Sequence, residues 1–239
     1  MSRQNPTAAT FGKQATRARF DGRELFAAYV AHELRTPLAI QRALLELTLA
    51  NPNADTASWR DVAEDVLDAC LQQERLLEAC LTLARSEASL ARHDRIDLTE
   101  IAGDAVRTHD RNGLECVVTL EPASVAGDSA LLERLAANLV SNAIRHNLPG
   151  GRIEVATCTT AEQASFIVAN SGPVVSTAEL PRLFQPFYQR DSDAQLASGG
   201  IGLGLPIVQA IAHAHQACLA VEALGGGGLR VDVRFPAAR

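Results

Sequence analysis

The chain has 239 residues, a length that suits one large domain or two small ones. Its 28 acidic and 22 basic side chains leave a net charge of −6, which argues against nucleic acid or an anionic membrane surface as the main partner. Hydrophobic residues make up 47% of the chain and charged residues 21%, so disorder over most of the length is excluded.

Several classes of site and location are also disfavoured. No run of about 18 uninterrupted apolar residues occurs, so we expect no membrane-spanning helix and no membrane contact within the chain. Five cysteines at wide, irregular spacing fit free thiols in a reducing cytosol better than a disulfide framework. The six histidines contain no His-x-x-x-His pair, so a metal held by Cys or His is not expected. A cytoplasmic location follows.

The N-terminal part predicts a tail and a helical hairpin. Residues 1–21 are polar without a sustained hydrophobic period, which predicts a flexible tail or the remnant of a linker. From about residue 23 to residue 90 the sequence is rich in Ala and Leu, and its one short break, at 51–53, predicts two antiparallel helices. The second helix carries a heptad seam: Val62, Val66, Ala69, Gln73, Leu76, Cys80 and Leu83. Because two helices cannot enclose this much apolar surface, we expect a homodimeric four-helix bundle; packing on the chain's own C-terminal domain is the alternative.

Residues 94–239 combine strand and helix patterns. The strand candidates are 114–120, 153–157, 166–168, 218–224 and 229–235, and the helical patterns span 98–108, 128–146 and 203–216. Strands interleaved with helices, with a final hairpin turned by four glycines at 225–228, predict a mixed α/β sandwich.

The first candidate site is the sequence His32-Glu33-Leu34-Arg35-Thr36-Pro37-Leu38. A carboxylate that accepts the Nδ1 proton fixes the imidazole tautomer and raises the nucleophilicity of Nε2, which suits Glu33 beside His32. Thr36 lies one helical turn after His32 on the same face, and Pro37 removes a helical N–H donor. These residues predict a nucleophilic histidine; a solvated helix face with an incidental proline is the alternative.

The second candidate site lies in the predicted helix 128–146. Asn138 and Asn142 are four residues apart and present two amide oxygens on one face. Such oxygens suit a Mg²⁺ ion that phosphates already carry, because Mg²⁺ needs few protein ligands. Arg145, one turn beyond Asn142 and followed by His146, would offset phosphate charge. Ordinary surface asparagines are the alternative, although Asn is a poor residue inside a helix.

The third candidate site is the run Gly199-Gly200-Ile201-Gly202-Leu203-Gly204-Leu205-Pro206, which leads into the predicted helix 203–216. Glycines at this spacing let backbone N–H groups approach an anion, and a proline fits the first turn of a helix. The spacing matches neither a Walker loop nor a dinucleotide fingerprint. A phosphate loop is therefore predicted, with a glycine hinge as the alternative.

In this order, these segments resemble the sensor histidine kinases of two-component signalling. The sequence from His32 to Leu38 is similar to the family's H box, and 138–146 to its N box. Residues 183–188 resemble its F box and 200–205 its second glycine box. The resemblance extends from about residue 23 to residue 236, nearly the whole chain.

The resemblance implies a dimerisation and histidine-phosphotransfer domain at 22–93 and an ATP-binding catalytic domain at 94–239. It implies that His32 accepts a phosphoryl group from ATP and passes it to an aspartate of a response regulator, and that Thr36 serves a phosphatase reaction. Mg²⁺ would be held by Asn142. The expected nucleotide-binding residues are Asn138, Asn142, Arg145, His146, Asn170, Gly172, Arg190, Gly200, Gly202, Leu203 and Gly204. Members of the family often follow a membrane-spanning sensor, so the cytoplasmic portion of an inner-membrane sensor is a second expectation.

One segment departs from the family pattern. Where the family has Asp-x-Gly-x-Gly, this chain has Asn170-Ser171-Gly172-Pro173-Val174. Asn170 can still accept a hydrogen bond from the adenine amino group, although a neutral acceptor gives a weaker bond than a carboxylate. Two alternatives follow: a regulator-binding scaffold or phosphatase with a weakened nucleotide site, and a conformational ATPase of the gyrase and chaperone type.

Overall fold

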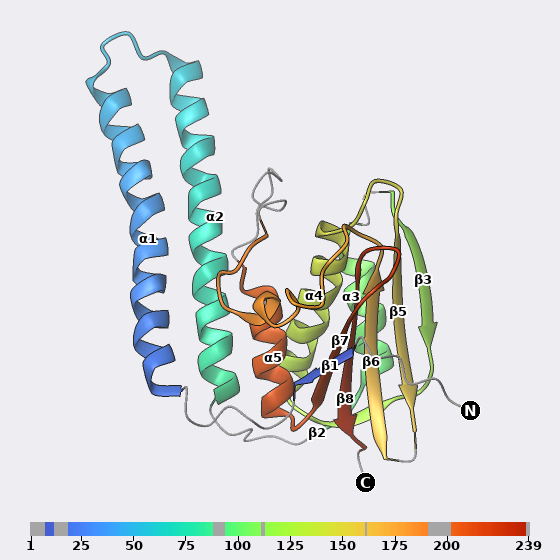
Figure 1. The fold of residues 1–239 in the computed structure, drawn as a ribbon. Coiled ribbons are helices and arrows are strands. Elements are labelled where there is room, and N and C mark those ends of the chain that lie inside the picture. The colour runs from blue at the N-terminus through green and yellow to red at the C-terminus, as the bar shows by residue number, and fades with distance from the viewer. Residues whose placement is uncertain are drawn as a thin grey trace. The chain divides into compact units, whose positions relative to one another are not determined.

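The computed structural model describes residues 8–11, 19–87, 94–110, 113–160, 162–190 and 202–237, and it divides the chain into two compact units. One unit is Lys13–Leu81, and the other joins Met1–Gly12 to Thr82–Arg239. Figure 1 shows a helical hairpin in the first unit and a sheet with helices in the second, as the sequence predicts. Within the described residues, none of the helices combines the length and apolar character that a membrane crossing requires.

A short turn connects two long helices, α1 (Arg19–Ala50) and α2 (Thr56–Glu87). Asp55 caps the start of α2, because its Oδ1 accepts bonds from the backbone N–H and the hydroxyl of Ser58, at 2.9 and 2.7 Å. These bonds favour the ionised carboxyl group and hold the pKa of Asp55 below its usual value. The predicted hairpin with a break at 51–53 is confirmed.

The facing sides of the two helices repeat with heptad spacing. On α2, the described members of the predicted seam are buried or half-buried, and Leu76 is only 3% exposed. The corresponding residues of α1 are Val30, Leu34, Pro37, Gln41, Leu44 and Thr48. Leucines beside these seams stay exposed, among them Leu38 at 60% and Leu67 at 59%. The hairpin by itself therefore leaves apolar side chains in water.

Two glutamines bond across the hairpin to the backbone of the opposite helix. Nε2 of Gln41 on α1 donates to the carbonyl of Val66 at 3.3 Å, and Nε2 of Gln73 on α2 donates to the carbonyl of Leu34 at 3.4 Å. Polar residues within an apolar seam specify helix register, because a shifted register leaves their donors without partners. The two bonds thus fix the register of α1 relative to α2 along the hairpin.

The second unit contains eight strands in two sheets, counted over the described residues. The strands are β1 (Ala8–Phe11), β2 (Asp94–Asp97), β3 (Glu115–Leu120), β4 (Ser124–Gly127), β5 (Arg152–Thr159), β6 (Gln163–Asn170), β7 (Cys218–Ala223) and β8 (Leu229–Pro236). The helices are α3 (Leu98–Thr108), α4 (Ser129–Arg145) and α5 (Gly204–Ala214), with a 3-10 turn η1 (Arg182–Phe184). The main sheet has the order β1-β7-β8-β6-β5-β3, and only β3 and β5 pair in parallel.

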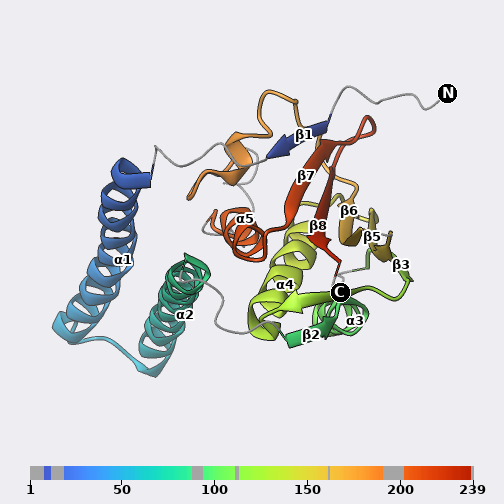
Figure 2. The ribbon, with the colours of Figure 1, turned by 90° about the horizontal axis from the view of Figure 1, so that it is seen from below.

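The core lies between the main sheet and the three helices, which lie along one of its faces (Figure 2). Alternate residues of the strands point to this side, and Val155, Val168 and Val231 pair in one row across β5, β6 and β8. Helix α4 contributes a stripe of leucines to the core, at positions 131, 132, 135 and 139. The predicted α/β sandwich is confirmed.

Three short strands were not predicted from the sequence. Strands β2 and β4 have only four residues each, too few to show alternation, and they form the small second sheet. Strand β1 lies within the predicted tail 1–21, where it pairs with β7, and α1 already begins at Arg19. The described part of that tail is therefore strand and helix rather than flexible chain.

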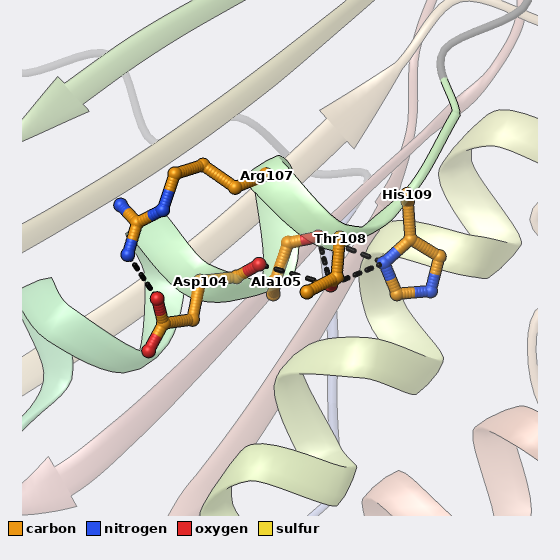
Figure 3. Close-up of polar contacts among 5 residues, drawn as sticks. All are labelled: Asp104, Ala105, Arg107, Thr108 and His109. Carbon is orange, nitrogen blue, oxygen red and sulfur yellow. Dashed lines mark hydrogen bonds and ion pairs between the residues drawn. The ribbon is translucent and has the colours of Figure 1, made fainter.

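Side chains cap the C-terminal end of α3 (Figure 3). The Thr108 hydroxyl donates to the carbonyl of Asp104 at 2.9 Å, and Nδ1 of His109 donates to the carbonyl of Ala105 at 2.8 Å. Arg107 forms an ion pair with Asp104 on the same helix. Because the last carbonyls of a helix lack helical partners, these bonds close α3 before the chain continues to β3.

His215 joins the end of α5 to the start of α4. The ring is 5% exposed; its Nδ1 donates to the carbonyl of Ile211 at 2.8 Å, and its Nε2 accepts the N–H of Asp128 at 3.1 Å. Asp128 is the N-cap of α4 and accepts the N–H of Leu131. Gly127 leaves room for the ring, because an added Cβ would overlap it. The helices that carry the second and third candidate sites are thus connected by one imidazole.

We expect His215→Ala to lower the free energy of unfolding by about 2–4 kcal/mol, because it opens a cavity and leaves the part-buried N–H of Asp128 without its acceptor. Urea unfolding followed by circular dichroism measures the change. His213→Ala, at an exposed position of the same helix, is the control and should change little. Equal midpoints for the two variants would contradict this role of the ring.

Candidate functional site

The first candidate site lies on α1. The backbone of His32 and Glu33 is helical, and their side chains lie outside the described residues. Thr36 shares the face of His32 one turn further along, and its side chain is exposed. Pro37 lies inside the helix and has no N–H for the carbonyl of Glu33. Position 32 therefore precedes a break in the helical hydrogen bonding, on a face that reaches solvent at Thr36.

The second and third candidate sites come together where α4 passes the start of α5. A Cβ added at Gly204, the first residue of α5, would lie 3.5 Å from Oδ1 of both Asn138 and Asn142. Nδ2 of Asn138 donates to the carbonyl of Arg134 at 2.8 Å, so the amide nitrogen is held by the helix while the oxygen faces Gly204. Two amide oxygens thus lie beside the N-terminal end of a helix, an arrangement that suits a cation with phosphates.

The start of α5 has the positive end of the helix dipole and follows the glycine segment closely. Leu203 is its N-cap and has no side-chain cap bond among the described residues, so the first N–H groups are not covered by a capping side chain. Gly202 has φ +71°, and its carbonyl accepts the N–H of Phe187 at 2.9 Å. An added Cβ at Gly202 would lie 2.8 Å from the carbonyl carbon of Phe187. The predicted F box therefore holds this end of the glycine loop; Gly200, also predicted at the phosphates, lies outside the described residues.

Residues 170–173, which begin with the last residue of β6, form a loop against the end of α4. We name these four residues the base loop. Nδ2 of Asn170 donates to the carbonyl of His146 at 3.3 Å and to that of Ser171 at 2.7 Å. Gly172 is buried, and an added Cβ there would lie 2.5 Å from the carbonyl oxygen of His146. Both donors of the Asn170 amide therefore point at backbone carbonyls, which orients Oδ1 as its remaining acceptor.

Ser171 ties the base loop to neighbouring segments. Its hydroxyl donates to Oδ1 of Asn147 at 2.7 Å and accepts the N–H of Arg152 at 2.7 Å. Gly151 permits this contact, since an added Cβ would overlap the Asn147 and Ser171 side chains. These residues were missed in the sequence analysis, because Asn147 and Ser171 have no recognisable spacing; they bond across a separation of 24 residues.

The two predicted arginines lie in different surroundings. Arg145 is half-buried in the last turn of α4, next to the C-cap His146. Arg190 donates from Nη2 to the carbonyl of Val174 at 2.8 Å, and its Nε lies 3.6 Å from Oε1 of Glu179. The segment 174–179, which directly follows the base loop in the sequence, thus holds the side chain of Arg190.

Glu179 accepts bonds from the N–H and hydroxyl of Ser176, at 3.0 and 2.9 Å. These bonds, with a smaller contribution from Arg190, hold the pKa of the Glu179 carboxyl below its usual value. The ionised carboxylate is thereby favoured beside the Arg190 guanidinium.

Two protein families match the chain. Residues 23–89 match the family described as His Kinase A (phospho-acceptor) domain. Residues 127–239 match the family described as Histidine kinase-, DNA gyrase B-, and HSP90-like ATPase. The first match contains His32 and the second contains Asn138, Asn142, the base loop and the start of α5.

Curated relatives agree with these matches. Sensor protein CutS of Streptomyces coelicolor is 39% identical over 222 residues, which are 91% of this chain and 53% of the relative. The histidine-protein kinase/phosphatase MprB of Mycolicibacterium vanbaalenii is 32% identical over 205 residues, 82% of this chain and 42% of the relative. The chain spans about half the length of the curated relatives it matches.

A solved structure of histidine kinase ThkA in complex with response regulator protein TrrA shares the fold, with a TM-score of 0.69 at 18% identity, covering 93% of this chain and 64% of that one. In this chain the phospho-acceptor segment precedes the ATPase-type segment. This chain belongs to the sensor histidine kinases of two-component systems.

Proposed function

We propose that this chain uses ATP to phosphorylate His32 and then passes the phosphoryl group to an aspartate of a response regulator. One observation carries the nucleotide part of the proposal: Oδ1 of Asn138 and Oδ1 of Asn142 both face the first residue of α5. Matches to a phospho-acceptor family and to an ATPase family support the two halves of the reaction. Kinase names among the relatives favour this reading over the scaffold and the conformational ATPase.

The adenine base would bind at the base loop. Because both N–H groups of the Asn170 amide donate to backbone carbonyls, its Oδ1 is the atom suited to accept the exocyclic amino group of adenine. Gly172 would help to line this site by letting the loop lie close to the end of α4, since an added Cβ would lie 2.5 Å from the carbonyl oxygen of His146. The neutral amide supplies a weaker bond than a carboxylate would, so we expect adenine selectivity with modest affinity.

The phosphates would bind between α4 and the start of α5. The backbone N–H groups of Gly202, Leu203 and Gly204, at the positive end of the α5 dipole, would donate to phosphate oxygens. Gly200 would extend this loop. Arg145, His146 and Arg190 would supply further donors. Asn142, assisted by Asn138, would hold Mg²⁺, which neutralises phosphate charge.

In the transfer step, Nε2 of His32 would form a bond to the γ-phosphorus while the bond from that phosphorus to the β-phosphate oxygen breaks, releasing ADP. Glu33 would accept the hydrogen bond of Nδ1–H and take up the proton that the charged ring must lose. The protein contributes positioning and charge neutralisation to this reaction rather than covalent chemistry. A carboxylate of the regulator then attacks the phosphorus of phosphohistidine, and the imidazole leaves.

Two further properties belong to this proposal. Thr36, exposed on the His32 face, would orient a water that removes the phosphoryl group from the regulator, and MprB is named a kinase/phosphatase. The exposed leucines beside the hairpin seams, such as Leu38 and Leu67, would be covered by a second copy in a homodimeric four-helix bundle. ATP and the regulator both suit a cytoplasmic location.

We expect His32→Gln to abolish labelling of the chain by radioactive ATP, because the amide offers no nucleophilic nitrogen, while ADP binding stays unchanged. In the unmodified chain the label should be labile to acid and stable to alkali. ADP affinity by calorimetry is the control. Label that persists in His32→Gln would contradict the assignment, and steady ATP turnover without any label would favour a conformational ATPase.

We expect Asn142→Ala to remove most of the increase in ADP affinity that Mg²⁺ provides, about tenfold or more, since the variant loses one amide oxygen beside Gly204. Calorimetric titration of ADP with Mg²⁺ and with a chelator measures this difference. Glu133→Gln, an exposed change on the same helix, should leave the Mg²⁺ effect intact. An undiminished Mg²⁺ effect in Asn142→Ala would remove Asn142 from the proposed site.

A further inference from the structure

The turn between β7 and β8 contains Leu224 and four glycines, Gly225 to Gly228, and the surroundings require a glycine at only two of these four positions. A Cβ added at Gly225 or Gly226 would find no atom within 4 Å. Gly227 and Gly228 are buried and have φ +92° and +96°. The geometry of the turn alone does not require Gly227 and Gly228 to be buried, so their contacts with the rest of the chain need a separate explanation.

Gly227 and Gly228 press their backbone against the base loop. The N–H of Gly228 donates to the carbonyl of Pro173 at 3.1 Å. An added Cβ at Gly228 would overlap the carbonyl oxygen of Asn170 and lie 2.9 Å from the carbonyl carbon of Ser171, and one at Gly227 would overlap the carbonyl oxygen of Gly172. The contact therefore leaves no room for a side chain at Gly227 or Gly228.

The base loop is held from its other side by α4. Nδ2 of Asn170 bonds to the carbonyl of His146, and Gly172 lies against the same carbonyl. The loop is thus enclosed between the end of α4 and the glycine turn, and it cannot yield to pressure from the turn without moving against His146. A displacement of the loop would also stretch the bonds that orient Oδ1 of Asn170.

We infer that Gly227 and Gly228 position the base loop, so that a side chain at either of these two positions weakens nucleotide binding although the turn need not touch the nucleotide. The expected effect on nucleotide affinity rests on the proposed function. The expected effect on the position of the base loop rests on the contacts of the loop alone. Gly227 and Gly228 are positioning residues, because they act through Asn170 and Gly172.

The test compares Gly228→Ala with two matched controls in the full chain. Gly226→Ala places a methyl group on the same turn in open space. Gly113→Ala imposes the same kind of strain, since its φ is +78°, with no atom within 4 Å of an added Cβ. Together they separate the crowding of the base loop from the effects of the turn sequence and of positive φ.

We expect Gly228→Ala to bind ADP about tenfold more weakly by calorimetry, and both controls to stay within about twofold of the unmodified chain. Hydrogen exchange without nucleotide supplies an independent readout. The Ser171 N–H, which bonds to the carbonyl of Arg152 at 2.9 Å, should exchange faster in Gly228→Ala than in either control.

Unchanged exchange at Ser171 in Gly228→Ala would overturn the inference, as would unchanged ADP affinity in that variant. If the unmodified chain fails to bind ADP, the proposed function is wrong, and the exchange rates still decide whether the turn positions the loop. Should Gly228→Ala not fold, Gly227→Ala makes the same comparison through the carbonyl of Gly172.

Discussion

The packing of α4 against the start of α5 is the constraint on which the nucleotide site depends. Gly204 has no side chain, so the amide oxygens of Asn138 and Asn142 approach the first turn of α5 directly. His215 connects the opposite ends of the same two helices, with its ring bonded to Asp128 and to Ile211. The N-terminal end of α4 is therefore anchored by α5, while the middle of α4 faces the N-terminal end of α5. A change in the relative position of these helices would disturb the fold and the site together.

Sequence patterns predicted most of the fold, because the elements that form it are long and strongly periodic. Helix α3 has the predicted bounds 98–108, and the hairpin breaks where Pro52 interrupts the pattern. Strands β2 and β4 could not be predicted, since four residues show no period and their pairing is with each other. Within the site, spacing identified Asn138 and Asn142 but could not reveal that Arg190 bonds to Val174, which depends on how a loop folds back.

Asn170 shows how a departure from a family pattern can be compensated locally. A carboxylate at this position would bring its oxygens toward the carbonyls of His146 and Ser171, whereas the amide donates to both of them. With Asn in place of Asp at position 170, the two N–H groups of Nδ2 donate to the protein, and Oδ1 is left as a hydrogen-bond acceptor. The same bonds hold the amide in one orientation.

The two glutamines of the hairpin restrict which motions the helices can share. A piston-like displacement of α1 by one residue, about 1.5 Å along the axis, would stretch the Gln41–Val66 and Gln73–Leu34 bonds at the same time. Pro37 lies between Leu34 and Gln41 and interrupts the helical hydrogen bonds of α1. The helix can therefore bend at Pro37 while at least one of the two glutamine bonds remains formed. Curvature of α1 is thus less restricted by these two bonds than translation of α1 along α2.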